Sequence, residues 1–259
     1  MNTFEATAAR PARAAICAAG FAVVAALGGC GGSVCIGLNG CTGTVWPPSL
    51  TLAGTAATGK ALASAAISAN CAQGAGSALS DGGGNYSMTL NATLPCVLTA
   101  VSGSTTLHSV AFAGGTFNVT PQTDLLLVYL AAQLNTTEAG LIAGFQSNLA
   151  FQQVLASQSN VLAAQSAVVA NLQQRYAVTL SAPAFLNTRF VVGQPGVDSD
   201  LEALAAAGAI DANGMPDAAA VSLMAAAGAA HPIATTPPPS NAPSSGGMGN
   251  PAGMSGGMM

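Results

Sequence analysis

Cysteine is the residue type in this chain whose number and spacing suggest the most chemistry. A thiol can be acylated, can pair with a second thiol, or can bind a metal ion. The six cysteines are Cys17, Cys30, Cys35, Cys41, Cys71 and Cys96. The last four allow three disulfide pairings, of which the nearest-neighbour arrangement, Cys35 with Cys41 and Cys71 with Cys96, is favoured. Disulfides at these positions indicate an oxidising compartment.

A metal site built from the same cysteines is the alternative interpretation, and the sequence counts against it. No Cys-x-x-Cys spacing occurs, and the only histidines are His108 and His231. Structural zinc sites combine such cysteine pairs with further cysteine or histidine ligands. His108 lies on an expected strand, where we expect its side chain to face solvent. The sequence therefore predicts no metal site.

Carboxylates that are close together in the sequence form a second group with potential chemistry. Asp198, Asp200 and Glu202 suggest calcium binding or acid–base catalysis, but at the start of an expected helix they point in different directions and suit its dipole. The segment 211–214 resembles the beginning of a calcium-binding loop, yet the glutamate required at the twelfth position is missing. Asp81 precedes three glycines and fits a turn. We expect structural roles for all of these carboxylates.

No arrangement of side chains in the sequence predicts catalysis or a cofactor. A serine hydrolase needs a nucleophile elbow, and the segment 74–77 has the wrong spacing for one. No glycine loop for a phosphate or a dinucleotide occurs. Thioethers near the C-terminus could bind Cu(I), but their spacing is loose: Met248, Met254, Met258 and Met259. We expect no catalytic residue and no cofactor, and keep an enzyme of unrecognised type and copper handling as alternatives.

The N-terminal segment has the features of an export signal. A basic start precedes an apolar run over residues 14–27, which is too short to span a membrane. The run ends in Leu27-Gly28-Gly29-Cys30, which resembles the lipobox of bacterial lipoproteins. The resemblance implies removal of residues 1–29 as a signal peptide, acylation of Cys30 and, because Gly31 rather than aspartate follows, anchoring in the outer membrane. An ordinary secretory signal is the alternative.

Composition narrows the range of partners. Charged residues make up 5% of the chain and the net charge is −4, so no basic surface is offered to nucleic acid. The expected partners are the membrane, through the lipid anchor, and a protein of the cell envelope, while the oligomeric state stays open. At 259 residues the chain is long enough for one or two small domains.

Residues 49–120 predict a β-sandwich. Seven short apolar segments are separated by turns, and one of them alternates clearly, with Tyr86, Met88 and Leu90 on one face. The region resembles the carboxypeptidase regulatory-like, or transthyretin-like, family in two motifs. The first motif comprises Gly54, Gly59, Leu62, Ala65 and Ile67, and the second runs from Ser80 to Tyr86. The resemblance implies an Ig-like/transthyretin-like antiparallel sandwich without peptidase activity.

Helical patterns follow the sandwich. Thr120, Pro121 and Asp124 fit the N-cap, N1 and first-turn positions of a helix. From Thr137 to about Tyr176, apolar pairs recur every seven residues, which predicts a helix face packed within the chain or against a partner. Short helices are expected after residue 198. The expected organisation is a Gly/Cys-rich tether (30–48), the sandwich (49–120), an α-helical region (121–230) and a disordered Pro/Gly/Ser/Met-rich tail (231–259).

The sequence as a whole predicts an α+β protein that is lipid-anchored in the bacterial cell envelope. Its expected role is binding or scaffolding without catalysis, through a sheet edge, a loop rim or a helix face. Neither the ligand nor the biological process follows from the residues.

Overall fold

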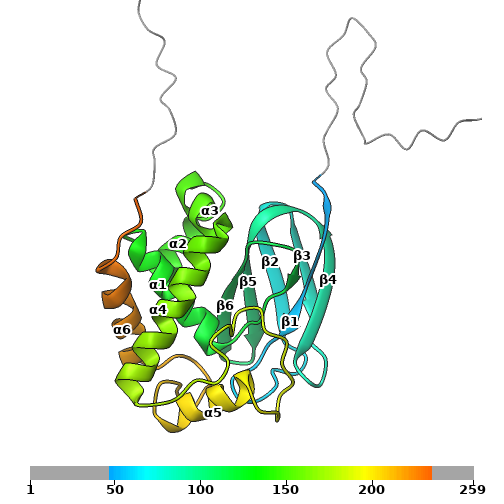
Figure 1. Ribbon diagram of the computed structural model, residues 1–259. Helices are drawn as coiled ribbons and strands as arrows, with labels where there is room; N and C mark the ends of the chain where they lie inside the picture. The colour runs from blue at the N-terminus through cyan, green and yellow to red at the C-terminus, as the bar shows by residue number, and fades with distance from the viewer. Residues whose placement is uncertain (1–46, 235–259) are drawn as a thin grey trace, which may run out of the picture. The chain divides into compact units, whose positions relative to one another are not determined.

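The fold is mixed α+β, as the sequence predicts, with strands followed by helices along the chain (Figure 1). A computed structural model describes residues 47–234. The expected signal peptide, most of the tether with Cys30, Cys35 and Cys41, and the tail from residue 235 onwards lie outside the described residues.

The strands within residues 47–234 form two sheets in a sandwich-like arrangement (Figure 1). One sheet has the strand order β4-β1-β7 and the other the order β3-β2-β5-β6. Neighbouring strands are antiparallel except for the short parallel pairing of β1 with β7, which the expected antiparallel sandwich does not include. The strands are β1 (Ser49–Thr55), β2 (Ala66–Gln73), β3 (Ala75–Leu79), β4 (Asn85–Asn91), β5 (Thr93–Ser102), β6 (Thr105–Ala111) and β7 (Gly115–Thr116).

Burial along the strands shows which faces are covered. Every second residue of β4 is buried, and Tyr86, Met88 and Leu90 lie in the interior as predicted. In the middle of β5 the consecutive residues 95–98 are all buried. This strand is covered on both faces, because the β4-β1-β7 sheet lies on one side of it and helix α3 packs on the other.

Six helices follow the strands within the described residues. They are α1 (Pro121–Gln133), α2 (Glu138–Gly144), α3 (Leu149–Ala156), α4 (Gln158–Tyr176), α5 (Val197–Ala206) and α6 (Ala218–Ala229). The residues of α1 from Pro121 to Ala132 are all buried, because this helix contacts β6, α2, α4 and α6. Its apolar sequence on every side suits a helix that is surrounded by the core. Helix α1 thereby joins the sandwich to the other helices.

The helical run expected from Thr137 to about Tyr176 is divided into α2, α3 and α4. Helix α2 ends at Gly144, and the side chain of Asn148 then accepts hydrogen bonds from the first backbone N–H groups of α3. Ser157 caps the start of α4 in the same way. Each polar cap offers the backbone a new helix start, which divides the run. The repeating apolar pairs still face inward, since α4 packs against α1, α3 and α6.

The segment between α4 and α5 is fastened to the sandwich by one fully buried side chain, Asn118. Its Oδ1 accepts a hydrogen bond from the backbone N–H of Thr55 at 3.1 Å. Its Nδ2 donates to the carbonyl oxygens of Phe185 and Thr188, each at 2.8 Å. All functional atoms of this amide are therefore satisfied, and they hold an otherwise irregular segment in place.

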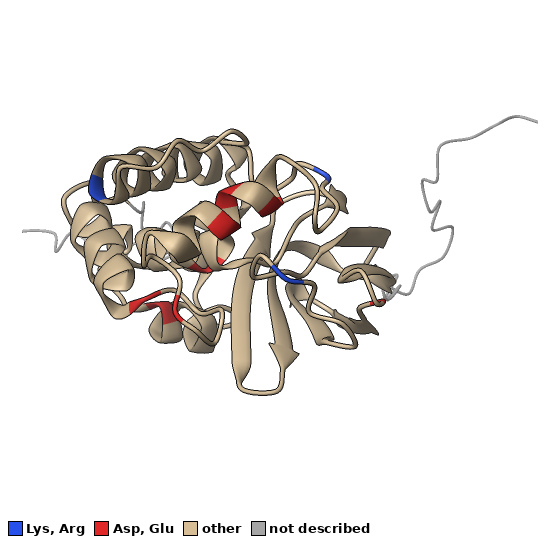
Figure 2. Cartoon of the chain, turned by 90° about the horizontal axis from the view of Figure 1, so that it is seen from below, with Lys and Arg blue, Asp and Glu red and all other residues tan. Residues whose placement is uncertain are grey.

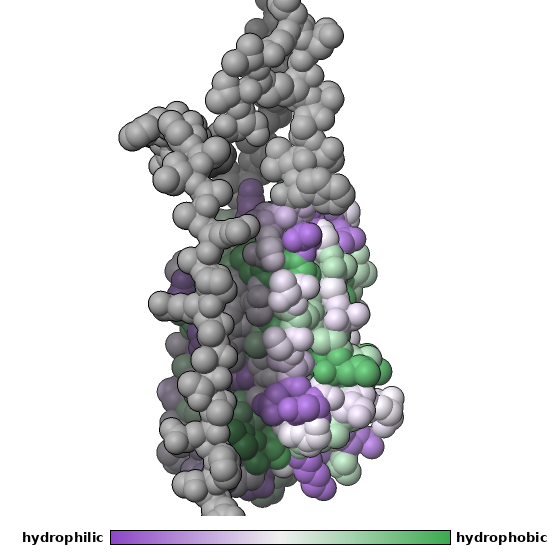
Figure 3. Space-filling model, turned by 90° about the vertical axis from the view of Figure 1, so that its right-hand side faces the viewer, coloured by the Kyte–Doolittle hydropathy of each residue, from purple (hydrophilic) through white to green (hydrophobic). Residues whose placement is uncertain are grey.

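The helices of the described residues can be compared with the length and apolarity that a membrane-spanning helix needs. Among residues 47–234, no single helix is both long and apolar enough to span one. Helices α1 and α2 reach the required length and composition only as a pair, and the chain bends by 82° between them. On the face of the molecule shown in Figure 3, hydrophobic and hydrophilic residues are interspersed wherever the described residues can be seen.

Candidate functional site

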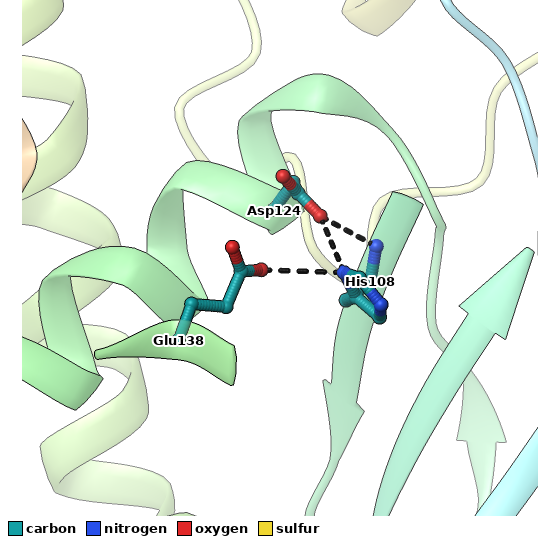
Figure 4. A group of neighbouring side chains, drawn as sticks. All are labelled: His108, Asp124 and Glu138. Atoms are coloured by element: carbon teal, nitrogen blue, oxygen red, sulfur yellow. Dashed lines mark hydrogen bonds and ion pairs between the residues drawn. The ribbon is translucent and has the colours of Figure 1, made fainter. Parts of the chain in front are cut away.

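Three ionisable side chains from three elements meet at one place, where β6 lies against the starts of α1 and α2 (Figure 4). They are His108 in β6, Asp124 in the first turn of α1 and Glu138 at the first position of α2. Elsewhere in the described residues charged positions are few, and the other neighbouring carboxylates shown in Figure 2 lie on a single helix, α5 (Val197–Ala206). The convergence of these three is therefore unusual for this molecule.

Helix caps position the two carboxylates. Thr120 and Thr123 form a capping box at the start of α1, which sets the direction of the helix and so the location of Asp124. The hydroxyl of Thr123 also donates to the carbonyl oxygen of His108 at 2.8 Å, which ties the helix start to the strand. Thr137 caps α2 and places Glu138 in its first turn.

Both carboxylates approach the same ring nitrogen of His108. Asp124 Oδ1 lies 2.9 Å from His108 Nδ1, and it also accepts a hydrogen bond of 2.7 Å from the backbone N–H of His108. Glu138 Oε1 lies 3.3 Å from the same Nδ1. This oxygen is buried and has no hydrogen bond of good geometry, so its contact with the ring is electrostatic.

The surroundings shift the pKa values of two of the three groups. Burial opposes a charge on His108, but the carboxylates of Asp124 and Glu138 outweigh it and raise the imidazole pKa to about 9. Burial raises the pKa of Glu138 to about 7; the histidine acts against this rise, and the nearby Asp124 carboxylate adds to it. With no other ligand bound, His108 therefore keeps its proton at neutral pH, and Glu138 takes up a proton more readily than an exposed glutamate does.

The arrangement can hold a proton or a cation, and it lacks the parts of a covalent catalyst. In the described part of the chain, no serine, threonine or cysteine side chain donates to the ring of His108. An activated nucleophile needs such a contact with its base. Ring nitrogen and carboxylate oxygens are, however, the ligand atoms that many divalent metal ions use.

The disulfide predicted in the sandwich is present. Cys71 and Cys96 are bonded to each other, and they stand directly opposite in the pairing of β2 with β5. Both side chains are fully buried. The other expected pair, Cys35 with Cys41, and the expected lipidation site, Cys30, lie outside the described residues.

Four of the carboxylates that attracted attention in the sequence accept hydrogen bonds from nearby backbone: Asp81, Asp198, Asp200 and Asp211. Asp200 accepts hydrogen bonds from the backbone N–H groups of Ser181 and Ala182, each at 2.8 Å. Asp198 accepts one from the backbone N–H of Gly193 at 2.7 Å. Within the segment 211–214 the side chain of Asp211 accepts bonds from its own turn, and the side chain of Asp81 does the same. These bonds organise turns and loop segments.

The expectation that His108 faces solvent is wrong. Its side chain is only 20% exposed, because the starts of α1 and α2 cover this part of β6. Asp124 has the first-turn position predicted for it, yet its carboxylate binds the histidine as well as suiting the helix dipole. No sequence motif links three residues so widely spaced, and the scarcity of histidine was the only signal that could have drawn attention to them.

Among residues 47–234, the group of His108, Asp124 and Glu138 is the only set of three such side chains close enough to share a metal ion. One hollow, about 360 Å³, lies beside β1 and β4, and its polar lining includes Thr55, Asn85 and Arg189. A second, about 290 Å³, lies between the start of β5 and α3 and is lined largely by apolar and amide side chains. Neither brings together a base with a nucleophile or a set of metal ligands.

Comparison of the chain with protein-family models, with curated proteins and with solved structures found no match. The interpretation of the site therefore rests on the geometry of its own residues.

Proposed function

We propose that this protein is a bacterial cell-envelope lipoprotein, anchored through Cys30 and engaged in binding or scaffolding rather than catalysis. The observation that carries the proposal is the sequence Leu27-Gly28-Gly29-Cys30 at the end of a short apolar run. Diacylglycerol and a further acyl chain on one cysteine bury enough methylene groups to make anchoring stable, at about 0.8 kcal/mol for each CH₂. The expected location is the outer membrane.

The buried disulfide supports export of the chain. Disulfides persist in oxidising compartments such as the bacterial periplasm and are rare in the cytosol. The Cys71–Cys96 disulfide lies in the interior of the sandwich and links β2 covalently to β5. A fold that includes this bond suits the compartment that the expected signal peptide implies.

We further propose that the strands form a transthyretin-like sandwich, in which the motif residues have structural tasks. A side chain at Gly54 would place its Cβ 2.0 Å from the carbonyl oxygen of Phe117, so only glycine fits there. The hydroxyl of Tyr86 donates to the same carbonyl oxygen. Asp81 accepts hydrogen bonds from the backbone N–H groups of Gly83 and Asn85 and so holds the turn before β4. These tasks concern packing and turns, which agrees with a non-enzymatic domain.

Mass spectrometry of the protein isolated from its host membranes tests the anchor. The expected result is a chain that begins at Cys30 and carries the mass of the acyl chains. A Cys30→Ser variant should remain unacylated and should leave the membrane fraction. An intact leader, or a mature chain without acyl mass, would contradict the proposal.

A further inference from the structure

We propose that His108, Asp124 and Glu138 form a binding site for a divalent transition-metal ion of the Zn²⁺ type. One candidate ligand atom from each side chain lies within 4.8 Å of the other two (Figure 4). The three residues come from β6, α1 and α2, so the site exists only when the sandwich and the helices are assembled. The inference concerns this cluster alone and does not depend on the lipid anchor.

The distances between the side chains suit a shared metal ion. Ligand atoms at about 2.0–2.2 Å from a zinc ion, with bond angles of roughly 90–110°, are about 3.0–3.5 Å apart. Nδ1 of His108 lies 2.9 Å from Asp124 Oδ1 and 3.3 Å from Glu138 Oε1. Both separations are close to the edges of such a coordination polyhedron, so small side-chain shifts are enough to admit the ion.

The charge of the cluster is the second argument. When both carboxylates are ionised, the cluster carries a net charge of −1 with a protonated histidine and −2 with a neutral one. Among residues 47–234 the only ion pairs are the two contacts of His108, so no lysine or arginine compensates the excess. Buried charges are stable when they are paired or bound to metal. A divalent cation with a neutral imidazole and both carboxylates brings the charge to zero.

The hydrogen bonds of the cluster leave Glu138 without a partner of its own. Asp124 alone accepts from both the backbone N–H and the ring nitrogen of His108. Glu138 Oε1 is buried at the same place and has no hydrogen bond. A carboxylate that served only to orient the histidine would duplicate Asp124, whereas a metal ion would give this oxygen a ligand bond.

The ligand set selects the class of ion. One imidazole nitrogen with two carboxylate oxygens suits Zn²⁺ and related transition ions, whereas Ca²⁺ and Mg²⁺ prefer sites made of oxygen alone. The side chains of His108 and Glu138 are 20% and 21% exposed, so water can reach the centre and complete the coordination. Three protein ligands and a water position are typical of open zinc sites.

Titration of the chelator-treated full chain with ZnCl₂, monitored by isothermal titration calorimetry, tests the proposal. The variants His108→Gln and Glu138→Gln each remove one ligand, and His231→Gln is the matched control because it removes an exposed histidine outside the cluster. We expect both cluster variants to lose one equivalent of zinc or to weaken its Kd by at least about a hundredfold, since even residues that support metal ligands change affinity about 10–100-fold. The control should bind like wild type.

Cysteines and methionines outside the described residues are common to all of these proteins, so any zinc they hold cancels in the comparison. Equal zinc binding by wild type and both cluster variants, or no binding by wild type, overturns the proposal. Binding of Ca²⁺ or Mg²⁺ as tight as that of Zn²⁺ overturns the assignment to a transition ion. If a cluster variant fails to fold, nitrogen NMR of the His231→Gln variant tests the site instead. His108 is the one histidine left in that variant, so its ring nitrogen signals must shift when zinc is added. An unchanged signal refutes the site.

Discussion

Removal of the disulfide between β2 and β5 should destabilise the folded chain by several kcal/mol. The bond joins residues 25 positions apart, and closing a loop of that length in the unfolded chain corresponds to about 3.5 kcal/mol in the chain-entropy model. For a domain of roughly 200 residues this amounts to a Tm lower by about 7–14 °C. The variants Cys71→Ala, Cys96→Ala and the double variant, melted under oxidising conditions against wild type, measure the effect by circular dichroism.

The pattern among these variants distinguishes a disulfide from two independent buried residues. Each single substitution already breaks the bond, so the double variant should cost little more than either single one. Two unlinked buried side chains would each lose their own packing, so the double variant would then cost clearly more than either single variant. Additive losses, or a double variant that melts within 2 °C of wild type, would refute the reasoning from loop closure.

Three further predictions concern contacts that the structure shows directly. Gly228→Ala should lower stability, although alanine favours helices, because the new Cβ would lie 2.3 Å from the carbonyl oxygen of Tyr129; thermal melting against the exposed Gly82→Ala checks this. Asn118→Ala should lower the free energy of unfolding by about 1–3 kcal/mol for each buried group left unpaired. Asn118→Asp should lower it further, because a carboxylate would face two carbonyl oxygens; urea titration measures both variants. In metal-free protein the folded pKa of His108 is raised to about 9, so the stability that His108 contributes is complete below pH 6.5 and is lost as the pH rises through 9. The Tm values of wild type and His108→Gln, measured from pH 6 to 10, should therefore converge as the pH rises.

Contradictory outcomes are equally specific. A Gly228→Ala variant that melts higher than wild type would mean that α6 can move away from α1 at little cost. Equal losses for the two Asn118 variants would mean that the amide donors do not matter. A difference between wild type and His108→Gln that grows above pH 9 would reverse the sign derived from the histidine pKa.

Local sequence patterns were sufficient for much of the fold. Alternation placed Tyr86, Met88 and Leu90 in the interior, and β4 has that burial in the structure. Thr120 and Pro121 marked the start of α1 because capping and a missing N–H are properties of single residues. The breaks in the helical run were not predicted, because Asn148 and Ser157 are as compatible with a helix surface as with a cap.

The cluster around His108 could not be predicted because it depends on which elements meet. Alternation orients a side chain only where one face of a strand is buried. The last residues of β6, from Ser109 to Ala111, are buried without alternation, since helix α1 covers the face that the other sheet does not. Nothing in the sequence states that α1 packs on β6, and without that contact a strand histidine is expected to face water.

The position of Glu138 could be attributed to the dipole of α2 alone, but its orientation could not. An acidic residue in the first turn of a helix is stabilised by the partial positive charge of the free N–H groups, and it reaches that stabilisation while it remains in water. Here Oε1 instead turns inward, loses contact with solvent and lies against a histidine whose backbone N–H and Nδ1 already bond Asp124. The helix dipole thus accounts for the residue type at this position and leaves the cost of its burial unexplained. A cation bound between the three side chains would offset that cost, which is why Glu138→Gln is the most informative substitution in the chain: it keeps the shape of the side chain and removes only the charge that the metal would need.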